Sequence, residues 1–237
     1  MKLFVLTGAG VSAESGLGTF RDRDGLWRRF DPMRLATPEA FAADPAEVHA
    51  FYNLRRRGTV AAAPNAAHRA LAHLETCLDA RGGRLFLCTQ NVDDLHERAG
   101  SRDVVHMHGE ILKARCLACA SVFEARDDLA IDRACPVCAA RGALRPDIVW
   151  FGESPKHLAR IEAALAEADL FVAAGTSGAV YPAAGYAGTA RRLGIRTIEL
   201  NLEPADNSGA FDDARYGPAS TTIPAFVNDI CGPAPRK

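Results

Sequence analysis

Two cysteine pairs have the spacing of a metal site. Cys116 and Cys119 form one C-x-x-C pair, and Cys135 and Cys138 form a second after the intervening residues 120–134. This spacing is typical of a zinc ribbon, in which each pair aims two sulfurs at one ion. Four thiolate ligands leave no open position for water or substrate. We therefore expect one structural Zn²⁺ that holds a small module together and takes no part in a reaction.

A glycine-rich turn follows an apolar run near the start of the chain. The run at residues 4–6 breaks into Thr7-Gly8-Ala9-Gly10, as a buried strand does when backbone amides turn to face a phosphate. Gly16 does not stand three positions after Gly10, so the G-x-G-x-x-G fingerprint is missing. An ordinary tight turn is the alternative. A hydride-transfer fold would also place an acid at the end of its second strand, whereas the acids near that distance lie in a loop-like stretch: Asp22, Asp24 and Asp31.

Polar residues also follow later apolar runs. They are Gln90, Asn91 and Asp93 after residues 85–88, Gly175, Thr176 and Ser177 after residues 170–174, and Asn201 and Glu203 after residues 197–200. Open parallel sheets bind ligands at the carboxyl ends of their strands, so these groups are candidate nucleotide contacts. Turn and helix-capping chemistry explains each set equally simply.

Two histidines, His106 and His108, follow another short apolar run. The near-neutral pKa of histidine suits many roles, so either one could be a loop residue or a base. An H-x-H pair could also be half a metal site. The four cysteines already satisfy the zinc, however, and no carboxylate follows at ligand spacing.

Strand-like and helical segments alternate along most of the chain. The strand-like runs are 3–6, 85–88, 104–105, 170–174 and 197–200, and the helical ones include 66–78 and 158–168. This alternation predicts an α/β fold with a Rossmann-like parallel sheet covered by helices on both faces. Two insertions, 22–64 and 113–145, are expected to form a smaller domain from a helical part and the zinc ribbon. The sheet domain then comprises residues 1–21, 65–112 and 146–237.

Composition excludes several classes of protein. The chain has 237 residues, 48% of them hydrophobic, and a formal net charge of -1. It can bury a sizeable core, and it has no bulk positive field for nucleic acid or an anionic membrane. The first residues already resemble a core strand, and no stretch approaches the ~18 apolar residues of a membrane-spanning helix. We expect a cytoplasmic protein with reduced cysteines, in which Cys77, Cys88 and Cys231 are small hydrophobic residues.

The motifs together, in their order, resemble those of the sirtuins, NAD-dependent protein lysine deacylases, and most closely the CobB-type bacterial class that includes desuccinylases. The resemblance runs from Phe4 to about Val227. It rests on the cysteine quartet and on these segments: Gly8-Ala9-Gly10-Val11-Ser12, Gly18-Thr19-Phe20-Arg21, Thr89-Gln90-Asn91-Val92-Asp93, His106-Met107-His108-Gly109, Gly175-Thr176-Ser177 and Leu200-Asn201-Leu202-Glu203.

The resemblance implies that NAD is consumed and that an acylated lysine enters between the sheet domain and the zinc domain. The acyl oxygen attacks C1' of the nicotinamide ribose, nicotinamide leaves, and an alkylimidate forms. His108 is the implied general base that activates a ribose hydroxyl, and Asn91 and Asp93 hold ribose, water and the nicotinamide amide. Phe20 shields the reacting face from water. The products are free lysine and 2'-O-acyl-ADP-ribose.

The resemblance also implies the binding residues. The cofactor contacts are Gly8, Ala9, Gly10, Ser12, Glu14, Phe20, Arg21, Gln90, Asn91, Asp93, Gly175, Thr176, Ser177, Asn201, Glu203 and Ala219. The substrate peptide adds as a strand beside segments 149–153 and 178–181, with contacts at Val149, Phe151, Gly152, Glu153 and Val180.

Tyr52 and Arg55 stand three positions apart and share a face if this segment is helical. From the residues alone, Arg55-Arg56-Arg57 is a solvated basic run. In the family, a Y-x-x-R pair at this place marks enzymes that accept succinyl- or malonyl-lysine, because the phenol and the guanidinium bind the distal carboxylate.

Two positions depart from the family pattern. Gly18-Thr19 stands where the family usually has Pro-Asp, and Gly178 stands where a larger apolar residue is common, which is expected to loosen the acyl or peptide channel. Two alternative functions are a protein mono-ADP-ribosyltransferase and a non-catalytic zinc-ribbon binding module. The complete set of His108, Asn91 and Asp93 argues against the second.

Overall fold

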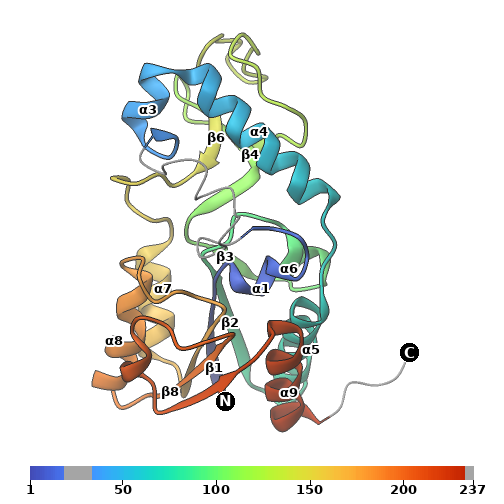
Figure 1. The fold of residues 1–237 in the computed structure, drawn as a ribbon, viewed down its shortest axis with the longest axis vertical. Coiled ribbons are helices and arrows are strands. Elements are labelled where there is room, and N and C mark those ends of the chain that lie inside the picture. The colour runs from blue at the N-terminus through green and yellow to red at the C-terminus, as the bar shows by residue number, and fades with distance from the viewer. Residues whose placement is uncertain (19–33, 233–237) are drawn as a thin grey trace.

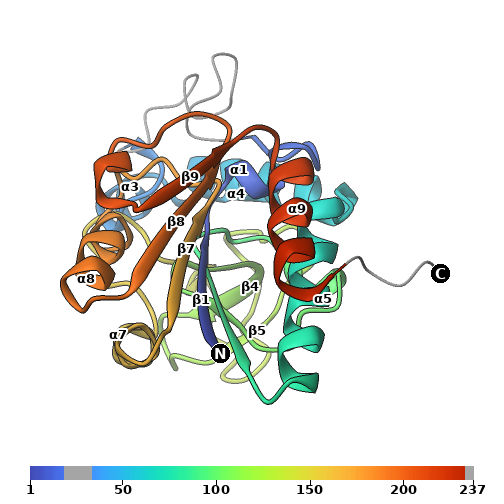
Figure 2. The same ribbon diagram turned by 90° about the horizontal axis from the view of Figure 1, so that it is seen from below.

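The computed structural model describes residues 1–18 and 34–232. Its larger part is a six-stranded parallel sheet with the strand order β3-β2-β1-β7-β8-β9 (Figures 1 and 2). The strands are β1 (Lys2–Thr7), β2 (Arg84–Thr89), β3 (Val104–His106), β7 (Leu170–Ala174), β8 (Arg196–Asn201) and β9 (Asp213–Tyr216). The expected parallel sheet is therefore confirmed, with β9 as an additional edge strand.

The central strand β1 explains why its sequence is a continuous apolar run. Leu3 and Val5 pack on one face of the sheet with helices α5 (Ala66–Ala80) and α9 (Ala219–Cys231). Phe4 and Leu6 pack on the opposite face with α7 (Leu158–Ala166) and α8 (Tyr186–Arg192). Both faces are thus covered, as Figure 2 shows, so the four positions from Leu3 to Leu6 are all apolar.

The smaller part combines an antiparallel sheet with two helices. Its sheet has the order β5-β4-β6, and β4 (Gly109–Cys116) and β6 (Leu144–Ile148) carry the chain into and out of it, with β5 (Val122–Glu124) at one edge. Helices α3 (Pro38–Ala43) and α4 (Pro45–Ala61) lie with this sheet at the upper end of Figure 1. The remaining elements are short: α1 (Gly10–Ala13), α6 (Leu95–Arg98), η2 (Ala183–Gly185) and η3 (Ser208–Ala210).

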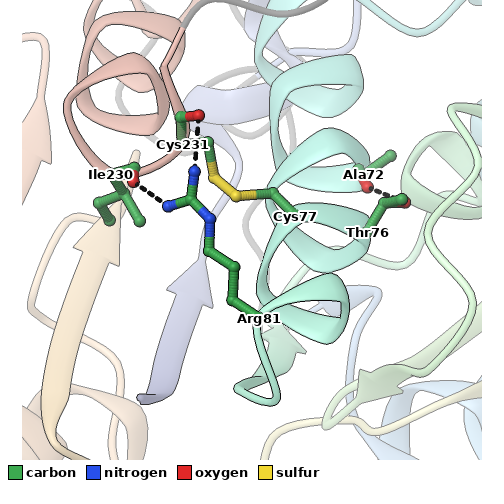
Figure 3. The surroundings of a disulfide bond; sticks show 6 residues. All are labelled: Ala72, Thr76, Cys77, Arg81, Ile230 and Cys231. Atoms are coloured by element: carbon green, nitrogen blue, oxygen red, sulfur yellow. Dashed lines mark hydrogen bonds between the residues drawn. A yellow bond between two sulfur atoms is a disulfide. The ribbon is translucent and has the colours of Figure 1, made fainter.

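A disulfide joins Cys77 in α5 to Cys231 at the end of α9 (Figure 3). The expectation that both cysteines are reduced and act as small hydrophobic residues is wrong. The two helices pack side by side on the same face of the sheet, which brings the two Cα atoms to 6.1 Å, within the range a disulfide requires. Arg81 donates to the carbonyl oxygens of Ile230 and Cys231, at 2.7 and 3.0 Å, and so caps the end of α9 (Figure 3).

Cys88 does act as a small hydrophobic residue, since it is fully buried in the core between the sheet and helices α7 and α8. Burial raises the pKa of its thiol. No helix among the described residues is both long and apolar enough to cross a membrane.

Candidate active site

A cavity of about 820 Å³ opens at the carboxyl ends of β1 and β7, where the strand order reverses direction. Open α/β sheets bind ligands at this switch point. Its volume falls within the ~300–1,000 Å³ of small-molecule sites. The predicted cofactor and substrate residues that line it are Gly8, Ala9, Gly10, Ser12, Glu14, Tyr52, Arg55, Gln90, Asn91, Asp93, His108, Val149, Phe151, Gly152, Glu153, Gly175, Thr176, Ser177, Val180, Asn201, Glu203 and Ala219. Phe20 and Arg21 lie outside the described residues.

We call the part of the cavity around residues 8–12, Asn91 and Asp93 the glycine end. Here the turn after β1 meets the turn after β7 at a distance that only glycine allows. A Cβ on Gly175 would lie 2.5 Å from the nitrogen of Val11, and Gly175 also has a φ of +61°. The amides of Gly8 and Gly10 donate to the carbonyl oxygens of Ala174 and Gly175, at 2.9 and 2.8 Å. These two amides therefore hold the loop itself.

Ser12 is the centre of a buried hydrogen-bond network at the glycine end. Its hydroxyl donates to Oδ2 of Asp93 at 3.0 Å and accepts from Nδ2 of Asn91 at 3.1 Å. Nδ2 of Asn91 also donates to the carbonyl oxygen of Gly8, at 3.1 Å. Burial raises the pKa of Asp93, while hydrogen bonds from Leu95 and Ser12 act in the opposite direction. These hydrogen bonds hold Asn91 and Asp93, both predicted cofactor contacts, against the glycine loop.

His68, at the start of α5, completes this network. Its Nδ1 accepts from the backbone amide of Asn65 at 3.3 Å, so Nε2 carries the proton and donates to Ser12 at 3.3 Å. Asn65 caps α5 and also donates to the carbonyl oxygen of Val11, at 2.8 Å. Burial lowers the pKa of His68 to about 4, which keeps its imidazole neutral.

The orientation of His108 identifies the free nitrogen of its ring. Nδ1 lies 3.1 Å from the carbonyl oxygen of Gln90. A carbonyl oxygen only accepts, so Nδ1 carries the proton and Nε2 keeps its lone pair. Burial lowers the pKa of His108. The ring is therefore a neutral base, and it lines the cavity.

His106 is held differently. Its Nε2 lies 2.6 Å from Oε1 of Glu97, and its Nδ1 lies 3.2 Å from the carbonyl oxygen of Asn91. Burial lowers the pKa of His106, but the Glu97 carboxylate outweighs this and the net shift is upward. Both ring nitrogens are engaged within the protein, so the geometry separates the two histidines of the H-x-H pair.

We call the part of the cavity around Tyr52, Arg55 and Trp150 the aromatic end. Tyr52 and Arg55 come from α4, and the guanidinium carbon of Arg55 lies 5.7 Å from the centre of the Tyr52 ring. Trp150 follows β6 and donates from its indole nitrogen to the Tyr52 hydroxyl at 2.9 Å. A phenol and a guanidinium from one helix face therefore line the same cavity as His108.

The loop after β6 forms one wall of the cavity. The amide of Val149 donates to the carbonyl oxygen of His108, and that of Phe151 donates to Ala36, both at 2.9 Å. Glu153 does not extend into the cavity as a free carboxylate, because it forms two bonds with Arg145, at 2.7 and 2.9 Å. Glu153 thus supports the loop.

Contacts between loops also hold the glycine end in place. Nδ2 of Asn201 donates to the carbonyl oxygen of Thr176 at 2.8 Å, and Nε2 of Gln90 donates to the Thr176 hydroxyl at 3.0 Å. Glu14 accepts from the amide and the hydroxyl of Ser220, at 2.8 and 2.6 Å. This last contact connects the loop after α1 to the first turn of α9.

The four predicted zinc ligands converge in the smaller part. Their sulfurs all lie within 4.8 Å of one another, with Cys116 and Cys138 at 3.7 Å and Cys119 and Cys135 at 3.8 Å. A tetrahedral zinc ion with Zn–S bonds of about 2.3 Å places its sulfurs about 3.8 Å apart. The cluster therefore fits one structural Zn²⁺, and no other group of three or more such ligands occurs in the described part of the chain.

Residues 8–182 match the model of the Sir2 family. The chain belongs to the Sir2 family. A Caulobacter vibrioides protein named NAD-dependent protein deacylase is 58% identical over 230 residues, 97% of this chain and 97% of that protein. A Leishmania major protein named NAD-dependent protein deacylase SIR2rp3 is 52% identical over 230 residues, 95% of this chain and 94% of that protein. The crystal structure of a Sir2 homologue in complex with NAD has a TM-score of 0.87 at 42% identity, covering 96% of this chain and 88% of that one.

Gly178, one of the two departures from the Sir2 pattern, does not leave open space in the structure. Gly178 was expected to open the channel, but its φ is +71° and a Cβ there would lie 2.1 Å from Oδ1 of Asn207. The Asn207 side chain fills the space, held by a 2.8 Å bond from its Nδ2 to the carbonyl oxygen of Ala184. Glycine here is a packing requirement. The departure at Thr19 lies outside the described residues.

Sequence reasoning missed two of the Sir2 site's supporting residues. His68 was not selected, although Asn65 three positions earlier is a recognisable capping signal for α5. His96 is fully buried beside it, with ring centres 4.9 Å apart, and its Nε2 lies 3.0 Å from the hydroxyl of Thr7. No sequence pattern pairs His96 with a threonine that lies 89 positions earlier.

Proposed function

We infer that this protein is an NAD-dependent protein lysine deacylase. The observation that carries this inference is a neutral histidine base, His108, lining one cavity between a glycine loop and a phenol–guanidinium pair. The family membership and the printed names of the two relatives support the same activity. Bound NAD supplies a ribose carbon from which nicotinamide leaves as the acyl oxygen attacks.

The residues of the chain perform the remaining tasks. Nε2 of His108 accepts a proton from a ribose hydroxyl, because its Nδ1 proton is committed to Gln90. Asn91 and Asp93 orient ribose and nicotinamide through their oxygens, since Ser12 and Gly8 fix both side chains in place. The loops that follow β1, β2, β7 and β8 bind the rest of the dinucleotide.

We propose that the preferred acyl groups carry a distal carboxylate, as succinyl and malonyl do, and that acetyl is also accepted. Tyr52 offers a hydroxyl and Arg55 offers a planar cation at the aromatic end, and the two together complement a carboxylate. The peptide would lie between segments 149–153 and 178–181, where main-chain pairing gives affinity with little sequence selection.

We also propose the domain division expected from the sequence, in which β4 and β6 carry the chain into and out of the second insertion. We propose the cytoplasm as the place of action, because the four zinc-ligating thiols must stay reduced. The Cys77–Cys231 disulfide is then an exception to the reduced state of the other cysteines.

One experiment tests the activity directly. Purified protein is incubated with NAD and three matched peptides carrying acetyl-, succinyl- or malonyl-lysine, and products are read by mass spectrometry. We expect free lysine, nicotinamide and an acylated ADP-ribose in equal amounts. Release of no nicotinamide from any peptide would overturn the proposal. ADP-ribose ending on protein would instead indicate a mono-ADP-ribosyltransferase.

A further inference from the structure

Trp150 and Tyr52 form a buried hydrogen bond that joins the loop after β6 to helix α4. The indole Nε1 lies 2.9 Å from the phenol oxygen, and the two side chains are 2% and 1% exposed. Trp150 follows β6 and Tyr52 lies in α4, 98 positions apart in the chain. Both residues line the cavity at its aromatic end.

The chemistry of the two groups fixes the direction of this bond. An indole nitrogen can only donate, so the phenol oxygen must be the acceptor. The Tyr52 hydroxyl proton therefore remains to be placed, and it has no acceptor among the described residues of the protein. Since the side chain lines the cavity, that proton is available to a ligand there.

Trp150 itself is clamped in one orientation. The guanidinium of Arg145 lies over its ring at 3.4 Å, and Glu153 accepts from its backbone amide at 2.8 Å while forming two bonds with Arg145. Phe41 also packs against Trp150, with the centres of the two rings 5.3 Å apart. The indole N–H is thus aimed at Tyr52 before any ligand binds.

The Arg145 cation also strengthens the donors in this chain of contacts. A cation on the face of the indole ring draws electron density from it, which makes the N–H a better donor. A hydroxyl that accepts a stronger hydrogen bond donates a stronger one in turn. Arg145 thus polarises the indole of Trp150, and the indole N–H in turn polarises the Tyr52 hydroxyl.

We propose that Trp150 is a positioning residue that orients the Tyr52 hydroxyl as a donor and so sets the preference for acyl groups ending in a carboxylate. The proposal rests on the deacylase function proposed above and adds a residue to its specificity. Trp150 touches Tyr52, and Tyr52 touches the acyl carboxylate.

The test compares Trp150→Phe, Tyr52→Phe and the double variant on succinyl- and acetyl-lysine peptides. Trp150→Phe keeps an aromatic ring for Arg145 to stack on and removes the indole N–H together with part of the ring volume, so a packing control is needed. We expect the ratio of succinyl to acetyl kcat/KM to fall about tenfold, mainly through the KM for the succinyl peptide, because a hydrogen bond to a charged group is weakened. In the Tyr52→Phe background, Trp150→Phe should change the ratio little, because the hydroxyl it orients is gone.

Phe41→Leu serves as the matched control, since it loosens packing on Trp150 without removing a polar group. It should lower both activities together and leave the ratio unchanged. An unchanged ratio in Trp150→Phe, or effects that simply add in the double variant, would overturn the role of Trp150 while the wild-type activity upholds the deacylase function. Loss of nicotinamide release from every peptide by the wild type would overturn both.

Discussion

The glycine end and the aromatic end of the cavity are constructed differently. At the glycine end, Ser12 comes from α1 directly after β1, and Asn91 and Asp93 come from the loop after β2 of the same sheet. The three side chains hold each other by hydrogen bonds. At the aromatic end, Tyr52 comes from helix α4 and Trp150 from the loop after β6, two segments that meet only in the folded molecule. On the proposed function, the large sheet preorganises cofactor binding, whereas acyl recognition depends on how α4 packs against the loop after β6.

The largest effect is expected for His108→Ala, which removes the base lying between the two ends. Turnover should fall about 10²–10⁴-fold, the usual contribution of a positioned base, while the glycine end keeps its affinity for NAD. Steady-state nicotinamide release and calorimetric NAD titration measure the two quantities. His106→Gln is the control, because His106 contacts Glu97 and not the cavity, and it should retain most activity. Near-normal turnover of His108→Ala would refute the assignment.

Arg55→Met should affect the aromatic end alone and leave the glycine end unchanged. We expect desuccinylation to fall about 10–100-fold more than deacetylation, because only the acidic acyl group loses a charged partner. Arg57→Met is the matched control, since Arg57 lies in the same basic run but pairs with Asp128 at 2.5 Å outside the cavity. Competition between the two peptides in one reaction gives the ratio directly. Equal losses on both peptides would contradict a separate aromatic end.

The Cys77–Cys231 disulfide should stabilise the sheet part, and with it the glycine end, because α9 also carries Ser220. Cys77→Ala is expected to lower the free energy of unfolding by about 2–4 kcal/mol. Urea denaturation of both proteins, with and without dithiothreitol, measures the difference. The reductant should lower the stability of the wild type by opening the disulfide, an effect that Cys77→Ala cannot show because it has no disulfide to open. Identical unfolding curves for the two proteins would rule out the bond.

The smallest expected effect is the loss of stability at low pH caused by His68 at the glycine end. The folded protein keeps His68 neutral down to its pKa of about 4, whereas the unfolded chain binds a proton below the ordinary value of 6.5. Stability from this group is therefore fully present above pH 6.5 and is lost as the pH falls, by about 2 kcal/mol at pH 5. Urea titrations at pH 7 and pH 5 measure the loss. His68→Gln should flatten this dependence, and a slope that it leaves unchanged would exclude His68 as the cause.

The sequence predicted best those elements whose side chains are buried on both faces. Strands β1, β2 and β7 appear as apolar runs because helices cover the sheet on both sides. Strand β9 was missed because it is an edge strand with its residues half-buried or exposed. Strands β4 and β6 were missed as a pair because antiparallel pairing with mixed composition gives no continuous run.

The candidate site, like the fold, was predictable only in part. Residues that follow strands could be assembled at one edge of the sheet, since that edge is fixed by the parallel topology. The bond from Trp150 to Tyr52 and the carbonyl that orients His108 depend on backbone positions that no spacing reveals. The Cys77–Cys231 bond likewise required the packing of two helices whose cysteines are 154 positions apart.

That bond has a topological consequence. It closes a ring of covalent links that contains the zinc cluster, strands β4 and β6 and every strand of the large sheet except β1. A protease that cuts once anywhere inside this ring cannot release a fragment. The nicked molecule should migrate at full length in a gel run without reductant and separate into two bands only after the sulfur bridge is opened.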